Sequence, residues 1–391
     1  MSIYNSYNRI EIEITSKCNA RCPGCSRTYQ GETHPGLPVK DFTAENFIKN
    51  VPVNAIRGKE IEFCGVFGDP IMHRDLLTII NYINQCDPSF VHIDTNGSIQ
   101  NPAFWTKLAK SGVSVTFSVD GHRETNHLYR VNTNFDKILE NMRAFAFAGG
   151  KGSWEYIVFD HNKHELEKAR DEAHELGLDF MERRNDRSVD YWTSYIKEKK
   201  EGKIVTKKVD IVQSSKTQFQ KEAEKREEEK DKNQEVKKVV EKKKEEYHIK
   251  CLYLHEKKLF MGFDGRLWPC CWFHDIYNGN GNPDVLDSEA HKITYHKLRE
   301  LDSVYGVGWN SVFHNSWEDV LGHEYYTKVL PNTFDKDSPN YDSKNAVPKC
   351  FKKCKNSGKT RNVEYHMHIK DKEGVLVSDG DPMNPSQSWH K

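Results

Sequence analysis

Three cysteines near the N-terminus have a spacing that could bind a metal centre. Cys18, Cys22 and Cys25 lie in the stretch EITSKCNARCPGCSRT with the spacing C-x3-C-x2-C. Thiolates this close together can bind zinc or three irons of a [4Fe–4S] cluster. Structural zinc needs a fourth ligand, and this stretch contains no histidine or further cysteine, whereas three ligands on a cluster leave one iron open. The positive charges that favour thiolates here come from Lys17, Arg21 and Arg27.

A second group of cysteines lies in the C-terminal part of the chain. Cys251, Gly265 and Cys270 have the spacing C-x13-G-x4-C, and the stretch LFMGFDGRLWPCC predicts a hairpin that turns at Asp264-Gly265. Four thiolates here could hold a second [4Fe–4S] cluster or a structural zinc ion. The spacing from Gly265 favours Cys270, although the adjacent Cys271 could replace it. The full group is Cys251, Cys270, Cys271, Cys350 and Cys354.

The elements that must position these cysteines are short β-type runs alternating with amphipathic stretches. The pattern predicts strands at 9–15, 60–64, 90–95, 114–119, 154–159 and 178–183. It predicts helices at 43–51, 75–85, 102–111, 135–147 and 163–176. Strands separated by helices are typical of βαβ units and a parallel sheet, either open or closed toward a barrel. Chemistry is expected in the loops after the strands, and the first cysteine stretch directly follows the first strand.

Composition narrows the class of protein. Lys+Arg and Asp+Glu both number 58, so the absence of net charge argues against a general binder of nucleic acid or membrane surfaces. The N-terminus lacks the features of a signal peptide, and no run approaches the roughly 18 apolar residues of a membrane helix. We therefore expect a cytoplasmic protein, in which cysteines are more often ligands or core residues than disulfides.

Changes in composition divide the chain into four segments. Residues 1–184 form the α/β core, and residues 251–355 return to globular texture with many aromatic residues. Residues 185–250 form a charged insertion or linker, which contains KEAEKREEEKDKNQEVKKVVEKKKEEY and is expected to be helical or disordered. This insertion is either a solvated segment or an arm that docks a partner. Residues 356–391 form a polar, loosely held tail.

The C-x3-C-x2-C motif after the first strand resembles the radical S-adenosylmethionine (radical SAM) superfamily. Four more stretches at successive strand ends are similar to that family: CGVFGDP, DTNG, FSVDG and the following HLYR. The resemblance implies a partial (β/α)6 barrel of parallel strands and a [4Fe–4S] cluster on Cys18, Cys22 and Cys25. The residues that it implies for binding S-adenosylmethionine are Gly68, Asp69, Thr95, Asn96, Ser118, Asp120 and Arg130.

The resemblance also implies roles for some of these residues. Gly68 would let the backbone approach the cofactor, and Asp69, where the family usually has glutamate, would face the methionine amino group. Arg130 would pair with the methionine carboxylate, a bidentate task that suits a guanidinium. One departure is Gly24, because the family usually has an aromatic residue before the third cysteine. It leaves the packing of the adenine side of the cofactor unexplained.

The C-terminal cysteines resemble those of the twitch domain, the shortened relative of the SPASM domain. The resemblance implies a small α+β iron–sulfur domain in which Cys251, Cys270, Cys350 and Cys354 hold an auxiliary [4Fe–4S] cluster. The last pair is spaced C-x3-C in place of the usual C-x2-C. A structural zinc site on the same residues is the alternative.

Together these resemblances imply an oxidoreductase. One electron from the first cluster would cleave S-adenosylmethionine, and the resulting 5′-deoxyadenosyl radical would abstract a substrate hydrogen atom. The second cluster would assist oxidation or cross-linking of a small molecule or of a peptide or protein side chain, with flavodoxin or ferredoxin as electron donor. No leader-binding segment precedes residue 8, which favours a small molecule or an exposed protein side chain. The alternative is a non-catalytic zinc protein or electron carrier.

Overall fold

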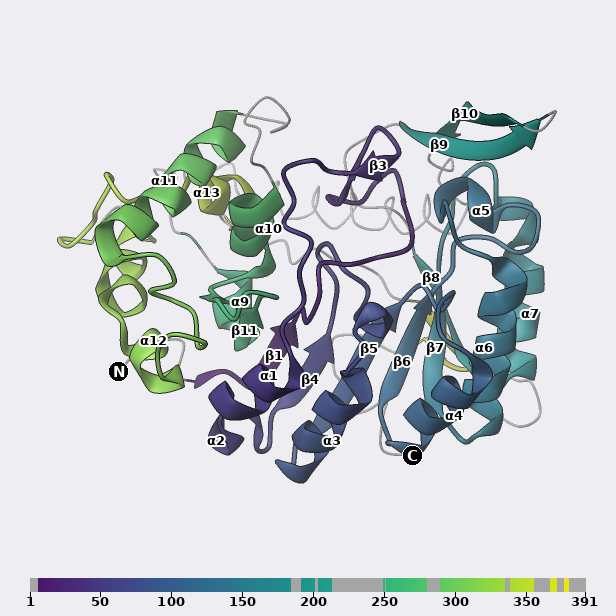
Figure 1. Cartoon of the computed structure of the whole chain (residues 1–391), viewed down its shortest axis with the longest axis horizontal. Coiled ribbons are helices and arrows are strands. Elements are labelled where there is room, and N and C mark those ends of the chain that lie inside the picture. Colours follow the sequence, from purple (N-terminus) through teal and green to yellow (C-terminus); the bar gives the residue numbers. More distant parts are fainter. Residues whose placement is uncertain are drawn as a thin grey trace, which may run out of the picture.

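A mostly parallel sheet forms the frame of the protein (Figure 1). The computed structural model describes residues 6–183, 191–200, 203–212, 249, 251–279, 289–334, 338–354, 366–370 and 376–379. The strand order is β12-β11-β1-β4-β5-β6-β7-β8-β13-β14. The strands are β1 (Arg9–Ile12), β4 (Glu60–Phe63), β5 (Phe90–Thr95), β6 (Ser114–Ser118), β7 (Lys151–Ile157), β8 (Asp179–Arg183), β11 (Lys258–Met261), β12 (Leu267–Trp268), β13 (His366–Lys370) and β14 (Leu376–Asp379).

Alternation along β1 shows why the sheet has one apolar and one polar face. Ile10 and Ile12 are buried in the main core, whereas Arg9 and Glu11 take the alternate positions and form ion pairs. Strand β1 pairs in parallel with β4, so that Ile12 lies beside Phe63. The carboxyl ends of these neighbouring strands therefore meet at one edge, where the first cysteine loop begins.

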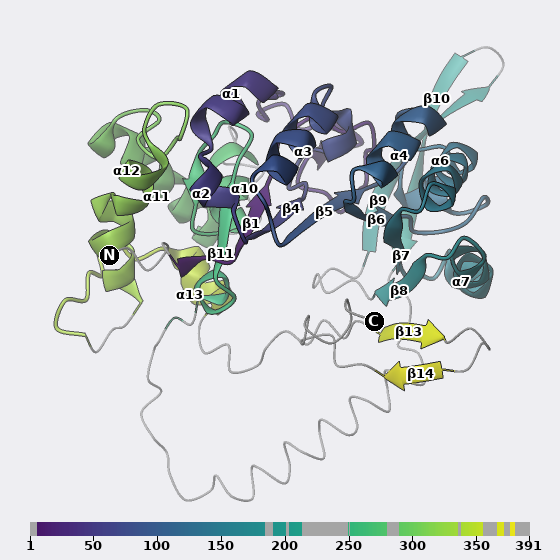
Figure 2. The ribbon, with the colours of Figure 1, turned by 90° about the horizontal axis from the view of Figure 1, so that it is seen from below.

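Helices cover the apolar face of the sheet (Figure 2). In α3, Ile79, Ile80 and Ile83 are fully buried in this core. Local capping fixes the helix starts, since the side chain of Asn134 accepts a hydrogen bond from the backbone of Lys137 at the start of α6. The helices of this layer are α1 (Ala44–Asn50), α3 (Leu76–Gln85), α4 (Pro102–Lys110), α6 (Phe135–Phe147) and α7 (Leu166–Glu175).

The expected α/β class and the six parallel strands of the partial barrel are confirmed, and β11 extends the sheet beyond them. Strand β11 pairs in parallel with β1, so the sheet continues into the part of the chain that was expected to form a separate small domain. This pairing covers an edge of β1 that would otherwise be open. The predicted hairpin is present as well, because β11 and β12 are antiparallel and Gly265 takes a left-handed φ of 74°.

The structure differs in part from two expectations about the remaining segments. Part of the insertion is a β-hairpin, in which β9 (Tyr191–Lys200) pairs antiparallel with β10 (Lys203–Val212). Aromatic and β-branched residues recur along YWTSYI and KIVTKKVDIV, which favours strands despite the many lysines. The tail is not wholly loose either, because β13 pairs antiparallel with β8. The charged stretch 221–247 lies outside the described residues.

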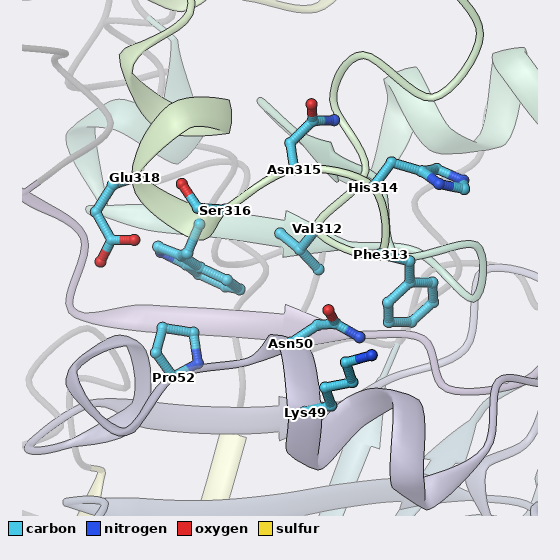
Figure 3. Close-up of a pocket in the computed structure, with 10 residues that line it drawn as sticks. Lys49, Asn50, Pro52, Val312, Phe313, His314, Asn315, Ser316 and Glu318 are labelled. Atoms are coloured by element: carbon cyan, nitrogen blue, oxygen red, sulfur yellow. The ribbon is translucent and has the colours of Figure 1, made fainter.

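The C-terminal part packs beside the β1 end of the sheet (Figure 1). Its helices are α9 (Leu252–His255), α10 (Cys271–Gly279), α11 (Glu289–Tyr305), α12 (Trp317–Gly322) and α13 (Pro348–Cys354). A surface hollow of about 360 Å³ lies between the end of α1 and the loop before α12, and Lys49, His314 and Glu318 are among its lining residues (Figure 3). No cysteine lines it. Over the described ranges, every helix is too short or too polar to cross a membrane.

Candidate active site

The first cysteine loop is tied down on both sides. The Ser16 hydroxyl donates to the Pro38 carbonyl oxygen at 2.6 Å, and the buried Arg27 guanidinium donates to the Ser16 carbonyl oxygen. Within the loop, the Cys25 amide donates to the Cys22 carbonyl oxygen at 3.1 Å, which forms a tight turn between these two cysteines. The loop therefore holds its thiols in place through backbone contacts.

Asp69 is the centre of a hydrogen-bond network beside Cys18. Its carboxylate accepts hydrogen bonds from the Thr95 hydroxyl at 2.8 Å, the Asn96 amide at 2.8 Å and the Asn96 side chain at 2.7 Å. Asn96 Nδ2 also lies 3.8 Å from the Cys18 sulfur. Burial raises the pKa of Asp69 to about 6, although these hydrogen bonds oppose the shift. The fold thus brings together, after β4 and β5, three residues that the sequence predicts for the site.

Gly68 packs against the backbone at the start of the first cysteine loop. A Cβ atom at Gly68 would lie 1.7 Å from the Thr15 carbonyl oxygen, so only glycine fits against the start of the cysteine loop. The amide of Asp69 donates to the Lys17 carbonyl oxygen at 2.8 Å in the same place. Gly68 therefore allows two backbones to pack together here. Whether it also faces the cofactor stays a prediction.

Asp120 and Arg130 form a buried ion pair on the other side of the loop. Arg130 Nε lies 2.6 Å from Asp120 Oδ2, and the Asp120 side chain is fully buried. Arg130 Nη1 lies 4.0 Å from the Cys22 sulfur. Attraction to Asp120 and Cys22 raises the pKa of Arg130 despite its burial. Ser118 is half-buried at the end of β6, and its predicted role stays a prediction.

Burial sets the ionisation of the thiols. It raises the pKa of Cys18 well above its ordinary value and that of Cys22 to about 11, with proximity to the neighbouring thiols adding to the shift. Buried thiols of this kind become thiolates when a cation binds them. Arg130 and Arg27 supply positive charge beside the group, and both act on the thiols electrostatically.

Four of the C-terminal cysteines also converge. Cys251 precedes α9, Cys270 immediately precedes α10, and Cys350 and Cys354 lie one turn apart on α13. The thiols of Cys251 and Cys350 lie close enough to Cys270 to raise its pKa. The thiol of Cys354 raises the pKa of Cys251 in the same way. Cys271 also raises the pKa of Cys270, but its own pKa responds mainly to burial, Glu11 and Tyr253 rather than to other cysteines. The geometry therefore favours Cys270 over Cys271 within the group.

The thiols of neither cysteine group form a tight set of ligand atoms in the described part of the chain. Sulfur atoms around tetrahedral zinc lie about 3.8 Å apart, as follows from Zn–S bonds of about 2.3 Å. In the described part of the chain, the one set of three cysteine, histidine or carboxylate ligand atoms all within 4.8 Å of one another is Glu124, His164 and Glu165. A cluster and a zinc ion both stay predictions for these thiols.

A buried pair that the sequence interpretation missed connects the two cysteine groups. Glu13 Oε1 accepts hydrogen bonds from the amides of Phe67 (2.6 Å) and Gly68 (2.9 Å). Its other oxygen lies 2.7 Å from Nε2 of His274, and neither side chain is more than 1% exposed. His274 lies on α10, four residues after Cys270. The turn that precedes Asp69 and the helix that follows Cys270 are thus held by one carboxylate.

Removing that carboxylate is expected to destabilise the fold. We expect Glu13→Ala to lower the free energy of unfolding by about 3–5 kcal/mol, because it leaves a buried partner and two backbone amides unsatisfied. Glu60→Ala, which removes the half-exposed partner of Arg9, is the control and should cost about 1 kcal/mol or less. Anaerobic thermal unfolding measures both. Equal losses would contradict the account of Glu13.

The polar face of the sheet carries a row of charged side chains below the site. His92 lies 3.1 Å from Asp94, Arg183 lies 2.9 Å from Glu155, and Arg9 lies 3.7 Å from Glu62. Burial raises the pKa of Glu62 to about 7, and the nearby carboxylates of Glu11 and Asp94 add to the shift. Burial likewise raises the pKa of Glu155 to about 7. This face can therefore hold protonated carboxyl groups near neutral pH.

The raised pKa of Glu62 gives a pH-dependent stability. The folded chain keeps this proton to higher pH than the unfolded chain, so the contribution of Glu62 to stability falls between about pH 4.5 and 7. Relative to wild type, the free energy of unfolding of Glu62→Gln should rise by about 1–3 kcal/mol as the pH is raised from 4 to 8. Unfolding midpoints at both pH values measure it. The exposed Glu140→Gln on α6 is the control, and the same trend there would contradict the explanation.

Part of the chain is similar to a known protein family. Residues 12–173 match the model of the radical SAM superfamily, so this part of the chain is a radical SAM domain. The family implies a [4Fe–4S] cluster and S-adenosylmethionine. An S-adenosylmethionine-dependent nucleotide dehydratase from Selenomonas ruminantium is 30% identical over 114 residues, which make up 27% of this chain and 38% of that protein. The match thus spans little more than a third of the relative's length.

Solved structures with a similar arrangement include SuiB and anSMEcpe. Streptococcus suis SuiB bound to precursor peptide SuiA aligns with 70% of this chain and 62% of its own, at 12% identity and a TM-score of 0.46. Native anSMEcpe with bound AdoMet aligns with 82% of this chain and 83% of its own, at 14% identity and a TM-score of 0.44. Both TM-scores are below 0.5, so neither likeness bears on function.

Proposed function

We propose that the chain is a radical SAM oxidoreductase with two iron–sulfur clusters. Cys18, Cys22 and Cys25 hold the first cluster, and S-adenosylmethionine binds beside it. The observation that carries this proposal is the meeting of three loop thiols with Asp69 and Arg130 at the carboxyl ends of the parallel strands. Such a position is where the chemistry of parallel α/β folds is expected.

The residues around the cysteines suit this role. When bound, the cluster would supply the electron that splits S-adenosylmethionine into methionine and a 5′-deoxyadenosyl radical. Asp69 orients Thr95 and Asn96 and offers a carboxylate for the methionine amino group. Arg130, which Asp120 holds through Nε, directs Nη1 toward Cys22 and offers positive charge for the methionine carboxylate. Cys22, Asp69 and Asp120 are buried, which limits the access of water to this part of the site.

The second cysteine group would complete an oxidation. Once a hydrogen atom has left the substrate, formation of a double bond, carbonyl or cross-link requires the loss of one more electron and a proton. Cys251, Cys270, Cys350 and Cys354 would hold the electron acceptor as an auxiliary [4Fe–4S] cluster of the twitch type. We propose a small molecule or a peptide or protein side chain as substrate, and flavodoxin or ferredoxin as the source of the first electron.

The proposal is tested by anaerobic reconstitution of the whole chain with iron and sulfide. With dithionite and S-adenosylmethionine, we expect mass spectrometry to detect methionine and 5′-deoxyadenosine in equal amounts. A non-catalytic zinc protein or electron carrier would form neither product, and that result would overturn the proposal.

A second candidate is dehydration of a nucleotide, which the name of the Selenomonas ruminantium relative suggests. Loss of water is redox-neutral overall, so it does not need a second cluster as electron acceptor. Candidate nucleotides added to the reconstituted protein distinguish the two reactions. A product lighter by one water favours dehydration, and a product lighter by two hydrogens favours oxidation.

A further inference from the structure

The β9–β10 hairpin sits on the first cysteine loop, although it follows that loop by more than 160 residues (Figure 1). The Ser194 hydroxyl donates to the Leu128 carbonyl oxygen at 2.6 Å, and the Asp160 amide donates to the Val212 carbonyl oxygen at 3.2 Å. Ile211 is fully buried in the small apolar cluster that contains Cys22. The base of the hairpin is therefore a fixed wall of the cysteine site.

Trp192 of this wall packs where Gly24 leaves room. A Cβ atom on Gly24 would lie 3.3 Å from the Trp192 ring and 2.8 Å from the Tyr129 hydroxyl. The Trp192 ring centroid lies 6.1 Å from those of Tyr129 and Phe159. The residue before Cys25 thus has no side chain, and an indole from β9 occupies the space beside it.

Trp192 is also the member of this aromatic group that remains accessible. Tyr129 is 7% exposed and Phe159 is fully buried, whereas Trp192 is half-buried. Cys18 and Cys25 pack against the same cluster. A planar ligand beside these thiols would therefore meet the indole rather than the two buried rings.

We propose that Trp192 is a positioning residue whose indole contacts the adenine ring of S-adenosylmethionine at the first cysteine site. This inference rests on the proposed function. Stacking of a base on an aromatic side chain increases affinity by about tenfold. Trp192 of the hairpin thereby provides an aromatic ring beside Gly24, where the cysteine loop itself has none.

A matched pair of substitutions tests this role in the full reconstituted protein. Trp192→Phe keeps an aromatic ring, whereas Trp192→Leu fills apolar space without one. We expect the Kd for S-adenosylmethionine to rise at least about fivefold in the leucine variant and to stay within about twofold in the phenylalanine variant. Iron content and the cluster absorption band should stay unchanged in both. Ile204→Ala, at an exposed position of the hairpin, is the control and should bind like wild type.

A rescue variant separates contact with the cofactor from a purely structural role. Adding Gly24→Phe and Tyr129→Phe to Trp192→Leu should recover most of the lost affinity, because it returns an aromatic ring from the cysteine loop and removes the hydroxyl that a Cβ at Gly24 would meet. Equal affinity of the leucine and phenylalanine variants, or a gain in affinity in either, would overturn the role of Trp192. If the wild-type protein did not bind S-adenosylmethionine at all, the proposed function would be overturned instead, so the two failures are distinguishable.

Discussion

Replacing Cys22 by alanine is expected to abolish the formation of 5′-deoxyadenosine from S-adenosylmethionine. The substitution removes one of only three proposed ligands, and no other cysteine of the described chain lies in the same loop to replace it. The same result is expected for Cys18→Ala and Cys25→Ala. Anaerobic reconstitution with excess dithionite, followed by mass spectrometry of the nucleoside, measures the loss.

The control for these variants is Cys86→Ala. Cys86 is buried in the main core after α3 and belongs to neither cysteine group. Its removal should leave 5′-deoxyadenosine formation unchanged and cost only a small loss of stability. Wild-type activity in any one of the three loop variants would show that its cysteine is not a ligand.

Replacing Cys350 and Cys354 together is expected to separate the two half-reactions. The variant should lose about four of roughly eight irons, because the auxiliary cluster loses two of its four ligands. Cleavage of S-adenosylmethionine should persist, since these residues lie on α13, which contacts α11 in the C-terminal part and belongs to a different segment of the chain from the first cysteine loop. When a substrate has been identified, the double variant should fail to oxidise it. Iron analysis and product analysis of the same sample measure both effects.

Cys271→Ala is the matched control for this double variant. No cysteine is among the groups that act most strongly on its thiol, so the full iron content should remain. Loss of iron in Cys271→Ala with retention in Cys270→Ala would reverse the assignment. Zinc in place of iron at the second group after anaerobic purification would support the structural-zinc alternative and contradict the two-cluster account.

The sequence predicts much of the fold because the core has simple periodicity. Alternating isoleucines in β1 and the amphipathic pattern of α6 indicate the correct element types, and the observed α6 has the predicted bounds. Asp69, Thr95 and Asn96 could be grouped in advance because strand ends of a parallel sheet meet at one edge. Local patterns therefore predict both the frame and the side of the sheet that carries the site.

Other parts of the site depend on long-range contacts that local patterns do not contain. Glu13 and His274 are separated by 261 positions, and their bond requires β11 to pair with β1. Trp192 is similarly hidden, because the lysines of the insertion dominate its composition and favour a solvated helix. The aromatic and β-branched residues of YWTSYI were the available signal for a strand of the hairpin. Its docking on Gly24 could be found only in three dimensions.

The central claim is that three thiolates hold a cluster whose fourth iron binds S-adenosylmethionine. Electron paramagnetic resonance of the reduced, reconstituted chain with and without S-adenosylmethionine tests it directly. We predict that part of the wild-type signal changes on addition of the cofactor. The signal that remains after Cys18, Cys22 and Cys25 are all replaced by alanine should not change. A wild-type spectrum that does not change when S-adenosylmethionine is added would contradict the claim. A spectral change that persists in the triple variant would contradict it as well.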